Sequence, residues 1–88
     1  MKNNHVNKLY ETIIKLNTVQ ECKDFFKDLC TYREIEQMAQ RVYSAELLLK
    51  GETYENVIKE TDISSATLSR VSKCVKQGNG YRKFLKED

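Results

Sequence analysis

The segment after Asp62 carries small and cationic side chains suited to contact with a nucleic acid. Once its apolar positions are set aside, the exposed side of a helix starting at Ser64 or Ser65 presents Ser64, Ser65, Ala66, Ser69, Arg70 and Lys73. Small residues at the start of a helix let its backbone come close to the base pairs in the major groove of DNA. Hydroxyls can hydrogen-bond to base edges, a methyl group can contact thymine, and cations can meet phosphates or guanine. Capping of the helix would explain one of the two adjacent serines, but it does not explain Ser69.

The charge of the chain is unevenly distributed, although its formal net charge is only +2. Residues 1–62 contain nine basic and eleven acidic side chains, whereas residues 64–86 contain six basic ones and no acidic one. Cations near a helix C-terminus interact favourably with the helix dipole, which would account for Lys73 and Lys76. The dipole does not account for 23 consecutive residues without a carboxylate. The asymmetry therefore favours a surface that attracts phosphates.

Two short helices joined by a three-residue turn must position these side chains. Thr53 can cap a first helix ending at about Thr61, Asp62-Ile63-Ser64 forms the turn, and a second helix runs to about Lys76. The inward side of the pair is expected to contain Tyr54, Val57, Ile58, Leu68, Val71 and Val75.

The spacing of four apolar residues in this segment is typical of a helix-turn-helix held at a fixed angle. These four residues are Val57, Ile63, Leu68 and Val71. Asp62 stands where glycine is most usual in the turn, but aspartate tolerates a left-handed conformation. Ile58 stands where a small residue often lets the helices approach closely. On spacing alone, an ordinary helical hairpin that uses the same side chains as core is an equally good interpretation.

The rest of the chain also has helical periodicity. Apolar residues predict a helix near residues 3–16, and the capping box at Thr18–Glu21 opens a second helix through Leu29, with Phe25 and Phe26 in its core face. A similar pattern at Thr31–Glu34 opens the longest helix, which ends at Lys50-Gly51 because glycine suits the left-handed position after a helix. The apolar stripe of this helix is Ile35, Met38, Val42, Ala45 and Leu49.

Gly78-Asn79-Gly80 ends the helical pair, and residues 81–86 add a last helical turn. The predicted fold class is therefore all-α, with about six helices. We expect one helical domain over residues 1–88, in which residues 53–77 are the helix-turn-helix. Residues 1–50 are expected to be mainly a dimer core.

Composition excludes several other classes. The chain has 88 residues with no proline and three glycines, which leaves few turn residues for a β-sandwich or barrel. Its 40% hydrophobic content is too high for a disordered segment. No apolar stretch approaches the ~20 residues of a membrane helix, and the polar N-terminus does not have the pattern of a signal peptide.

The three cysteines give no sign of a metal site or an enzyme. Cys22, Cys30 and Cys74 form no C-x-x-C pair, and His5 is the single histidine. We interpret the thiols as small buried hydrophobes of a reduced, cytoplasmic protein. No Cys–His or paired-carboxylate arrangement points to catalysis, so neither enzymatic activity nor a cofactor nor a metal is expected.

Several segments resemble a known family. They are Leu29-Cys30-Thr31, Met38-Ala39-Gln40-Arg41, Leu48 to Tyr54, Ser65 to Val71, and Gly78-Asn79-Gly80-Tyr81. Together they resemble the Trp-repressor superfamily and are closest to its YerC/YecD branch. The likeness covers roughly residues 29–81, and the run Ala66–Arg70 is the most specific part. It implies an intertwined all-helical homodimer that presents two helix-turn-helix units to successive major grooves.

A dimer also agrees with the apolar content of the chain. Paired Phe25–Phe26 and a long apolar central helix supply more apolar surface than six short helices in an 88-residue monomer can easily bury. A shared core would bury this surface, as in obligate dimers that have no stable monomer.

The resemblance also implies where tryptophan would bind. Arg41 and Arg70 match two arginines that flank the indole in tryptophan-sensing members, and Thr31 matches a threonine near the ligand. A glycine that leaves room for the ligand corresponds to Val71, however, and a serine near its amino group corresponds to Cys74. A branched side chain and a weak thiol donor would both reduce this pocket. Tryptophan binding is therefore not expected, and any other effector is unknown.

The sequence thus predicts a sequence-specific regulator of transcription that binds double-stranded DNA as a homodimer, acting as a repressor without tryptophan. The alternative is a protein-interaction module whose helix-turn-helix binds another regulator or RNA polymerase. RNA binding is less favoured, because the chain lacks the aromatic stacking platform typical of single-strand readers.

Overall fold

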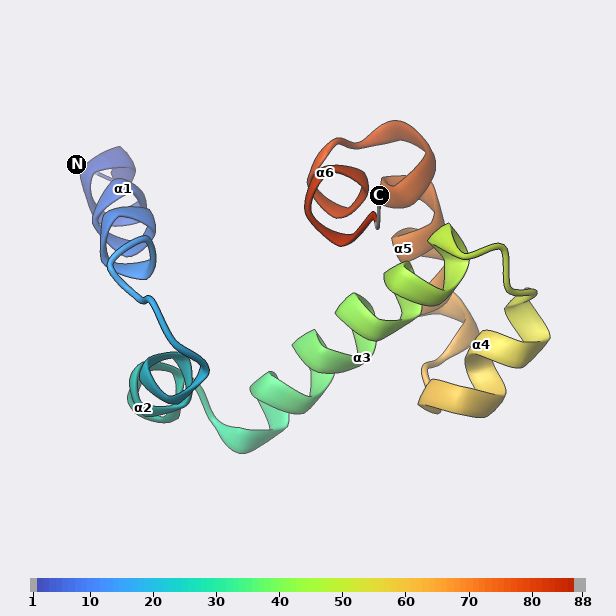
Figure 1. The fold of residues 1–88 in the computed structure, drawn as a ribbon, viewed down its shortest axis with the longest axis horizontal. Coiled ribbons are helices and arrows are strands. Elements are labelled where there is room, and N and C mark those ends of the chain that lie inside the picture. The colour runs from blue at the N-terminus through green and yellow to red at the C-terminus, as the bar shows by residue number, and fades with distance from the viewer. Residues whose placement is uncertain (1, 87–88) are drawn as a thin grey trace. The chain divides into compact units, whose positions relative to one another are not determined.

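The computed structural model describes residues 2–86, and within them it contains six helices and no strand (Figure 1). The helices are α1 (Lys2–Ile13), α2 (Val19–Leu29), α3 (Tyr32–Leu49), α4 (Tyr54–Thr61), α5 (Ser65–Gln77) and α6 (Gly80–Leu85). The predicted all-α class is confirmed. The helices belong to two compact units, Met1–Tyr32 and Arg33–Asp88. The assignment of residues 1–50 to a dimer core stays a prediction.

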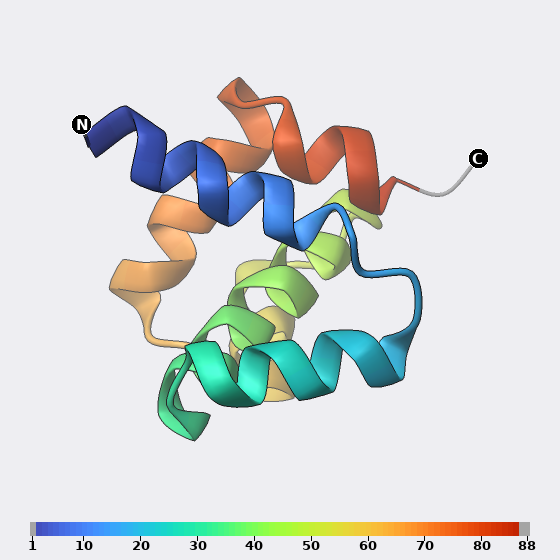
Figure 2. The ribbon, with the colours of Figure 1, turned by 90° about the vertical axis from the view of Figure 1, so that its left-hand side faces the viewer.

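The first unit consists of α1 and α2, which Figures 1 and 2 show as separate helices joined by residues 14–18. The helix predicted over 3–16 ends at Ile13. The Ile14 amide still bonds the Tyr10 carbonyl four residues back, but the amides of Lys15 and Leu16 bond three residues back at 3.1 Å and tighten the last turn. The predicted cap of α2 is present in part. Thr18 Oγ1 accepts a hydrogen bond from the Glu21 amide at 3.0 Å, but the Glu21 carboxylate accepts from the Asn17 amide at 2.8 Å, one residue upstream of the predicted position.

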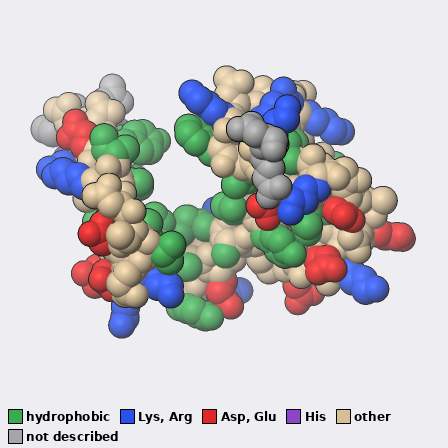
Figure 3. Space-filling view, viewed as in Figure 1, with side chains coloured by type: hydrophobic (Ala, Val, Ile, Leu, Met, Phe, Trp, Pro, Cys, Tyr) green, Lys and Arg blue, Asp and Glu red, His purple; other side chains and the backbone are tan. Residues whose placement is uncertain are grey.

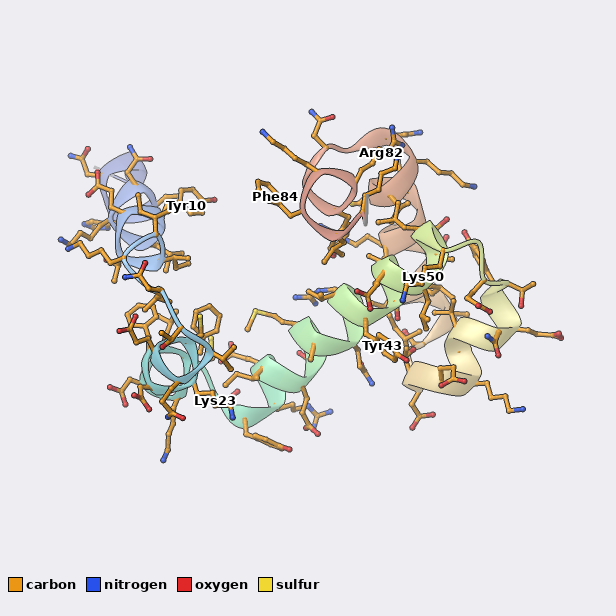
Figure 4. All side chains as sticks on the ribbon, viewed as in Figure 1. Tyr10, Lys23, Tyr43, Lys50, Arg82 and Phe84 are labelled. Carbon is orange, nitrogen blue, oxygen red and sulfur yellow. The ribbon has the colours of Figure 1, made fainter. Side chains whose placement is uncertain are left out.

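The apolar side chains of α1 and α2 are poorly covered. None of the residues of α2 is buried, and the rings of Phe25 and Phe26 are half-buried, edge to face, with centroids 5.9 Å apart. Other large apolar side chains of this unit are exposed, namely Val6, Leu9, Tyr10, Ile14, Val19, Leu29 and Tyr32. Tyr10, labelled in Figure 4, is 60% exposed. The first unit therefore has amphipathic helices but no buried core of its own in the described chain.

The second unit contains the buried core. Its buried apolar side chains come from the second half of α3, from α4, from α5 and from the turn between α4 and α5; they are Ala45, Leu47, Val57, Ile63, Leu68, Val71 and Val75. Side chains at the end of α3 and in α6 pack against this group, namely Leu48, Leu49, Tyr81 and Leu85. Two residues with positive φ stop the helices where expected, Gly51 (φ 91°) after α3 and Asp62 (φ 63°) after α4.

Some predicted core positions are wrong. Tyr54 and Ile58, which were expected on the inward side of the helix pair, are exposed, at 46% and 36%. A helix of eight residues buries one narrow stripe, and in α4 this stripe is occupied by Val57 and, one turn later, by half-buried Thr61. The thiols of Cys22 and Cys74 are exposed and that of Cys30 is intermediate, so the prediction of three buried thiols is also wrong.

Gly78 is required by a close approach of the backbone, which gives a test of the α5–α6 connection. A Cβ at this position would lie 2.8 Å from the carbonyl oxygen of Cys74, whereas a Cβ at Gly80 would meet nothing within 4 Å. We expect Gly78→Ala to lower the free energy of unfolding by about 1–3 kcal/mol, as overpacking does. The control Gly80→Ala should leave it unchanged or raise it. Urea denaturation followed by circular dichroism compares the two, and equal midpoints would contradict the contact.

Candidate nucleic-acid interface

Short local hydrogen bonds define the ends of α4 and α5. Thr53 caps α4 by accepting from the Asn56 amide at 3.2 Å. Left-handed Asp62 ends α4, and its amide donates to the Ile58 carbonyl at 2.8 Å. Ser64 then caps α5: its Oγ accepts from the Thr67 amide at 3.2 Å and donates to Thr67 Oγ1 at 2.9 Å. The predicted ends of these two helices are therefore confirmed to within one residue.

The four apolar residues predicted to hold the two helices together are all buried. Val57 and Leu68 are 0% exposed, Val71 is 1% exposed and Ile63 in the turn is 3% exposed. They belong to one core cluster, together with Ala45, Leu47 and Val75. Because one side of α5 is held in this cluster, its opposite side must face outward.

The outward side of α5 carries the predicted contact residues. Ser65, Ala66, Ser69, Arg70 and Lys73 are exposed, and residues 66, 69, 70 and 73 have the i, i+3, i+4, i+7 spacing of one helix face. Ser64 is also exposed, but its hydroxyl is engaged in the cap. Five of the six predicted residues thus offer side chains to a partner, while Ser64 has a structural role that explains one of the two adjacent serines.

The cations near the C-terminus have more than one role. Arg82, labelled in Figure 4, donates from Nη2 to the carbonyls of Val75 and Lys76, both at 2.7 Å. These are among the last carbonyls of α5, which have no partner within the helix, so Arg82 caps α5 and joins it to α6. Lys83 Nζ lies 5.6 Å from the centroid of the Phe84 ring. In the view of Figure 3, Lys and Arg side chains surround α6, whereas Asp and Glu gather over α4.

The structure places the predicted pocket residues in different environments. Val71 is part of the core, as its spacing predicted, whereas Arg70 and Cys74 are exposed and Arg41 is half-buried. Thr31 belongs to the first unit, and the pocket as a whole stays a prediction. An open groove of about 600 Å³ in the second unit lies elsewhere, between α3 and the end of α4, and is lined by Gln40, Tyr43 and Thr61 among others.

Sequence reasoning missed three polar residues that join α3 to the turn, namely Gln40, Ser44 and Thr61. Ser44 is completely buried, next to Ala45. The only signal in the sequence is a small polar residue beside an apolar stripe, which is too common to indicate a contact.

The part of the chain that the structure describes contains neither a metal-ligand cluster nor a membrane-spanning helix. The described residues include no group of three or more His, Cys, Asp or Glu side chains that could hold a metal ion. None of the helices in residues 2–86 has the length and apolarity needed to cross a membrane.

The chain is similar in sequence to known proteins. The family model described as Trp repressor protein matches residues 4–88. The uncharacterized protein YerC of Bacillus subtilis (strain 168) is 40% identical over 79 residues, which are 90% of this chain and 76% of YerC.

Two solved structures share the fold. A crystal structure of a candidate Trp repressor from Staphylococcus aureus superposes with a TM-score of 0.89 and 36% identity, covering 93% of this chain and 83% of that one. The crystal structure of a TrpR-like protein from Eubacterium eligens ATCC 27750 superposes with a TM-score of 0.87 and 34% identity, covering 96% of this chain and 94% of that one. The all-helical, Trp-repressor-like fold implied by the resemblance is therefore confirmed, whereas the intertwined homodimer stays a prediction.

The different roles of the two adjacent serines can be tested by stability. Ser64→Ala removes the acceptor for the Thr67 amide, and loss of an N-cap costs about 1 kcal/mol. Ser65→Ala is the matched control, because it removes an exposed hydroxyl one residue later. Urea denaturation should show a loss of about 1 kcal/mol for the first variant and a change within about 0.5 kcal/mol for the second. Equal losses would mean that the cap does not depend on Ser64.

Proposed function

The chain belongs to the Trp repressor protein family, whose members are regulators and not enzymes, and on this premise we propose that it is a sequence-specific DNA-binding repressor of transcription. The observation that carries the proposal is the outward side of α5. This side is small and hydroxyl-rich at its start, basic further along, and lies in a stretch of 23 residues without a carboxylate. Such a surface can enter the major groove and meet phosphates without repulsion.

Each α5 residue is assigned a role by its position along the helix. Ser65, Ala66 and Ser69 lie toward the N-terminal end, where a recognition helix meets base edges, so they are assigned to sequence discrimination. Arg70 and Lys73 lie further along and are assigned to phosphates, with guanine as the alternative partner for Arg70.

A homodimer is the proposed active form. Apolar side chains of α1, of α2 and of the segment between them are exposed in the single chain, with Ile14, directly after α1, 79% and Val19 73% exposed. Exposed apolar surface on this scale favours association, and a second copy with the same stripes can cover it symmetrically. Two copies would also present two α5 helices to one duplex.

The rival proposal is a protein-interaction module that binds another regulator or RNA polymerase. Its support is the exposed apolar pair Tyr54 and Ile58, one turn apart on α4. The hydroxyl-rich outward side of α5 favours DNA over this alternative. A partner retained by the tagged chain after nuclease treatment, with no affinity for any duplex, would favour the rival.

Binding to duplex DNA should depend strongly on salt. Each neutralised phosphate contributes about −0.9 to the slope of log K against log salt, so Lys73→Ala should weaken binding to every sequence and make the slope shallower by about one unit. Ser69→Ala should instead change the preference among sequences. Lys23→Ala, in α2, is the charge-matched control and should leave the slope unchanged. Fluorescence anisotropy over a salt series measures these values, and binding indifferent to salt would contradict the proposal.

The dimer can be tested by light scattering of the full chain at micromolar concentration. The expected mass is twice the chain mass of 10.3 kDa, and the melting temperature should rise with protein concentration. A sharp mass of one chain, together with melting independent of concentration, would exclude the proposed assembly.

DNA binding should not require tryptophan. Val71 fills space in the core, so its side chain already supplies contacts that hold α5. Calorimetry with millimolar tryptophan should show no heat of binding. DNA titrations should give the same DNA affinity with and without tryptophan. A tenfold gain in DNA affinity with tryptophan, about 1.4 kcal/mol of coupling, would prove this wrong. In the converse experiment, Val71→Gly should lose DNA affinity, and tryptophan should not restore it.

A further inference from the structure

Thr61, the last residue of α4, is the centre of a polar contact between α3 and the turn. Its Oγ1 donates to the Val57 carbonyl at 2.8 Å, one helical turn back. The same oxygen accepts from Ser44 Oγ of α3 at 3.2 Å and from the Ile63 amide of the turn at 3.3 Å. A hydroxyl has one proton to donate and two lone pairs, so all its hydrogen-bonding capacity is used.

Gln40 adds a second link from α3. Its Nε2 donates to the backbone carbonyl of Thr61 at 3.2 Å. The last carbonyls of a helix have no partner within it, so Gln40 satisfies a backbone group that α4 itself leaves open. We call Gln40, Ser44 and Thr61 the Thr61 network.

The Thr61 network constrains the direction of α5 in a way that the apolar core does not. Contacts among Val57, Leu68 and Val71 are non-directional, so they hold the helices together but tolerate small rotations. Hydrogen bonds weaken steeply when they are bent, and a buried hydroxyl such as that of Ser44 is costly to leave without a partner. Since Ile63 is followed directly by Ser64, the cap of α5, a shift of the turn would move the start of α5.

We propose that the Thr61 network fixes the angle at which α5 enters the major groove, and that it thereby determines discrimination among DNA sequences more than affinity for DNA in general. The proposal rests on the proposed DNA-binding function. Base contacts need side chains placed within about 0.5 Å, whereas contacts to phosphates tolerate more movement because they depend mainly on charge. Gln40, Ser44 and Thr61 are positioning residues here, acting through the backbone of the turn.

The main test uses two variants of Thr61. Thr61→Val keeps the branched shape and removes the hydroxyl, whereas Thr61→Ser keeps the hydroxyl and removes the methyl group. The probes are a duplex selected from a random pool by the native protein and a random-sequence duplex of equal length. We expect Thr61→Val to bind the selected duplex at least tenfold more weakly and the random duplex within twofold of native. Thr61→Ser should restore discrimination to within threefold.

Thr12→Val is the matched control. Thr12 Oγ1 makes the same kind of bond one helical turn back, to the Lys8 carbonyl at 2.7 Å, but it lies in α1 and joins no second helix. This variant should retain native discrimination. Ser44→Ala is the milder second variant, since it leaves Thr61 bonded to Val57 and Ile63, and it keeps the test possible if Thr61→Val folds poorly.

Hydrogen exchange without DNA supplies an independent readout. The Ile63 amide should exchange at least tenfold faster in Thr61→Val, which removes its acceptor, and less than tenfold faster in Ser44→Ala, which keeps it, while the Leu68 amide, bonded to the Ser64 carbonyl at 2.9 Å, stays protected in both. Faster exchange at both amides would indicate general loosening and overturn the proposal.

The DNA results separate this proposal from the function on which it rests. If the native protein selects no duplex, the proposed function fails, whatever the exchange of Ile63. If it selects one and Thr61→Val still discriminates, the positioning role is overturned and the function stands. Equal losses on both duplexes, or no rescue by Thr61→Ser, would also overturn it.

Discussion

The structure depends on a small apolar core at the contact of α4 and α5. In the described chain seven apolar side chains are buried, and four of them, Val57, Ile63, Leu68 and Val71, hold the two short helices together. Complete burial of one such side chain contributes about 1.5–3 kcal/mol, whereas ordering each residue of backbone costs about 1–2 kcal/mol. A core of this size can stabilise the helices that pack around it, but it cannot stabilise all six helices. The first unit, with no buried residue in α2, therefore needs another surface to cover its apolar stripes.

Local hydrogen bonds complement this small core. Thr18, Thr53 and Ser64 cap three of the helices, and Arg82 occupies the open carbonyls at the end of α5. Each of these bonds fixes where a helix begins or ends, which apolar contacts do poorly. The boundaries of the helix-turn-helix are thus set mainly by polar residues, and its cohesion by apolar ones. The outward side chains of α5 depend on both.

Sequence alone predicted the parts of the fold that are encoded locally. The caps at Thr53 and Ser64, the left-handed positions at Gly51 and Asp62, and the apolar spacing over residues 57–71 were confirmed, and the capping box at Thr18–Glu21 was confirmed in part. The errors concern the choice of face. Tyr54 and Ile58 are apolar and near Val57 in sequence, but which stripe of α4 is buried is decided by α3 and α5. Apolar type also misled for Cys22 and Cys74: Cys22 lies in α2, which has no buried residue, and Cys74 lies outside the buried stripe of α5.

The Thr61 network was beyond sequence reasoning for a related reason. Its hydrogen bonds join residues 17 and 21 positions apart, and serine, threonine and glutamine have no periodicity that marks such pairs. Arg82 is one of the six basic residues counted over 64–86, and a count of charges does not show that its guanidinium meets two carbonyls. Residue type predicts what a side chain can do, and only the packing of distant segments decides which partner it meets.

Val71 shows how this packing limits what the site can do. A side chain at this position either fills the space beside α5 or leaves it open. Here it is a buried valine in the same cluster as Val57 and Leu68, so the space is used for cohesion of the helix pair. A helix held by a side chain of its own chain has its direction set on folding, whereas a helix beside an open space can be shifted by whatever enters it. With Val71 on one side and Ser44–Thr61 joining α3 to the turn, α5 is restrained by residues that are present in every state of the chain. Regulation of α5 would therefore have to act on the residues around it, either through association of the chain with a second copy or through the Thr61 network.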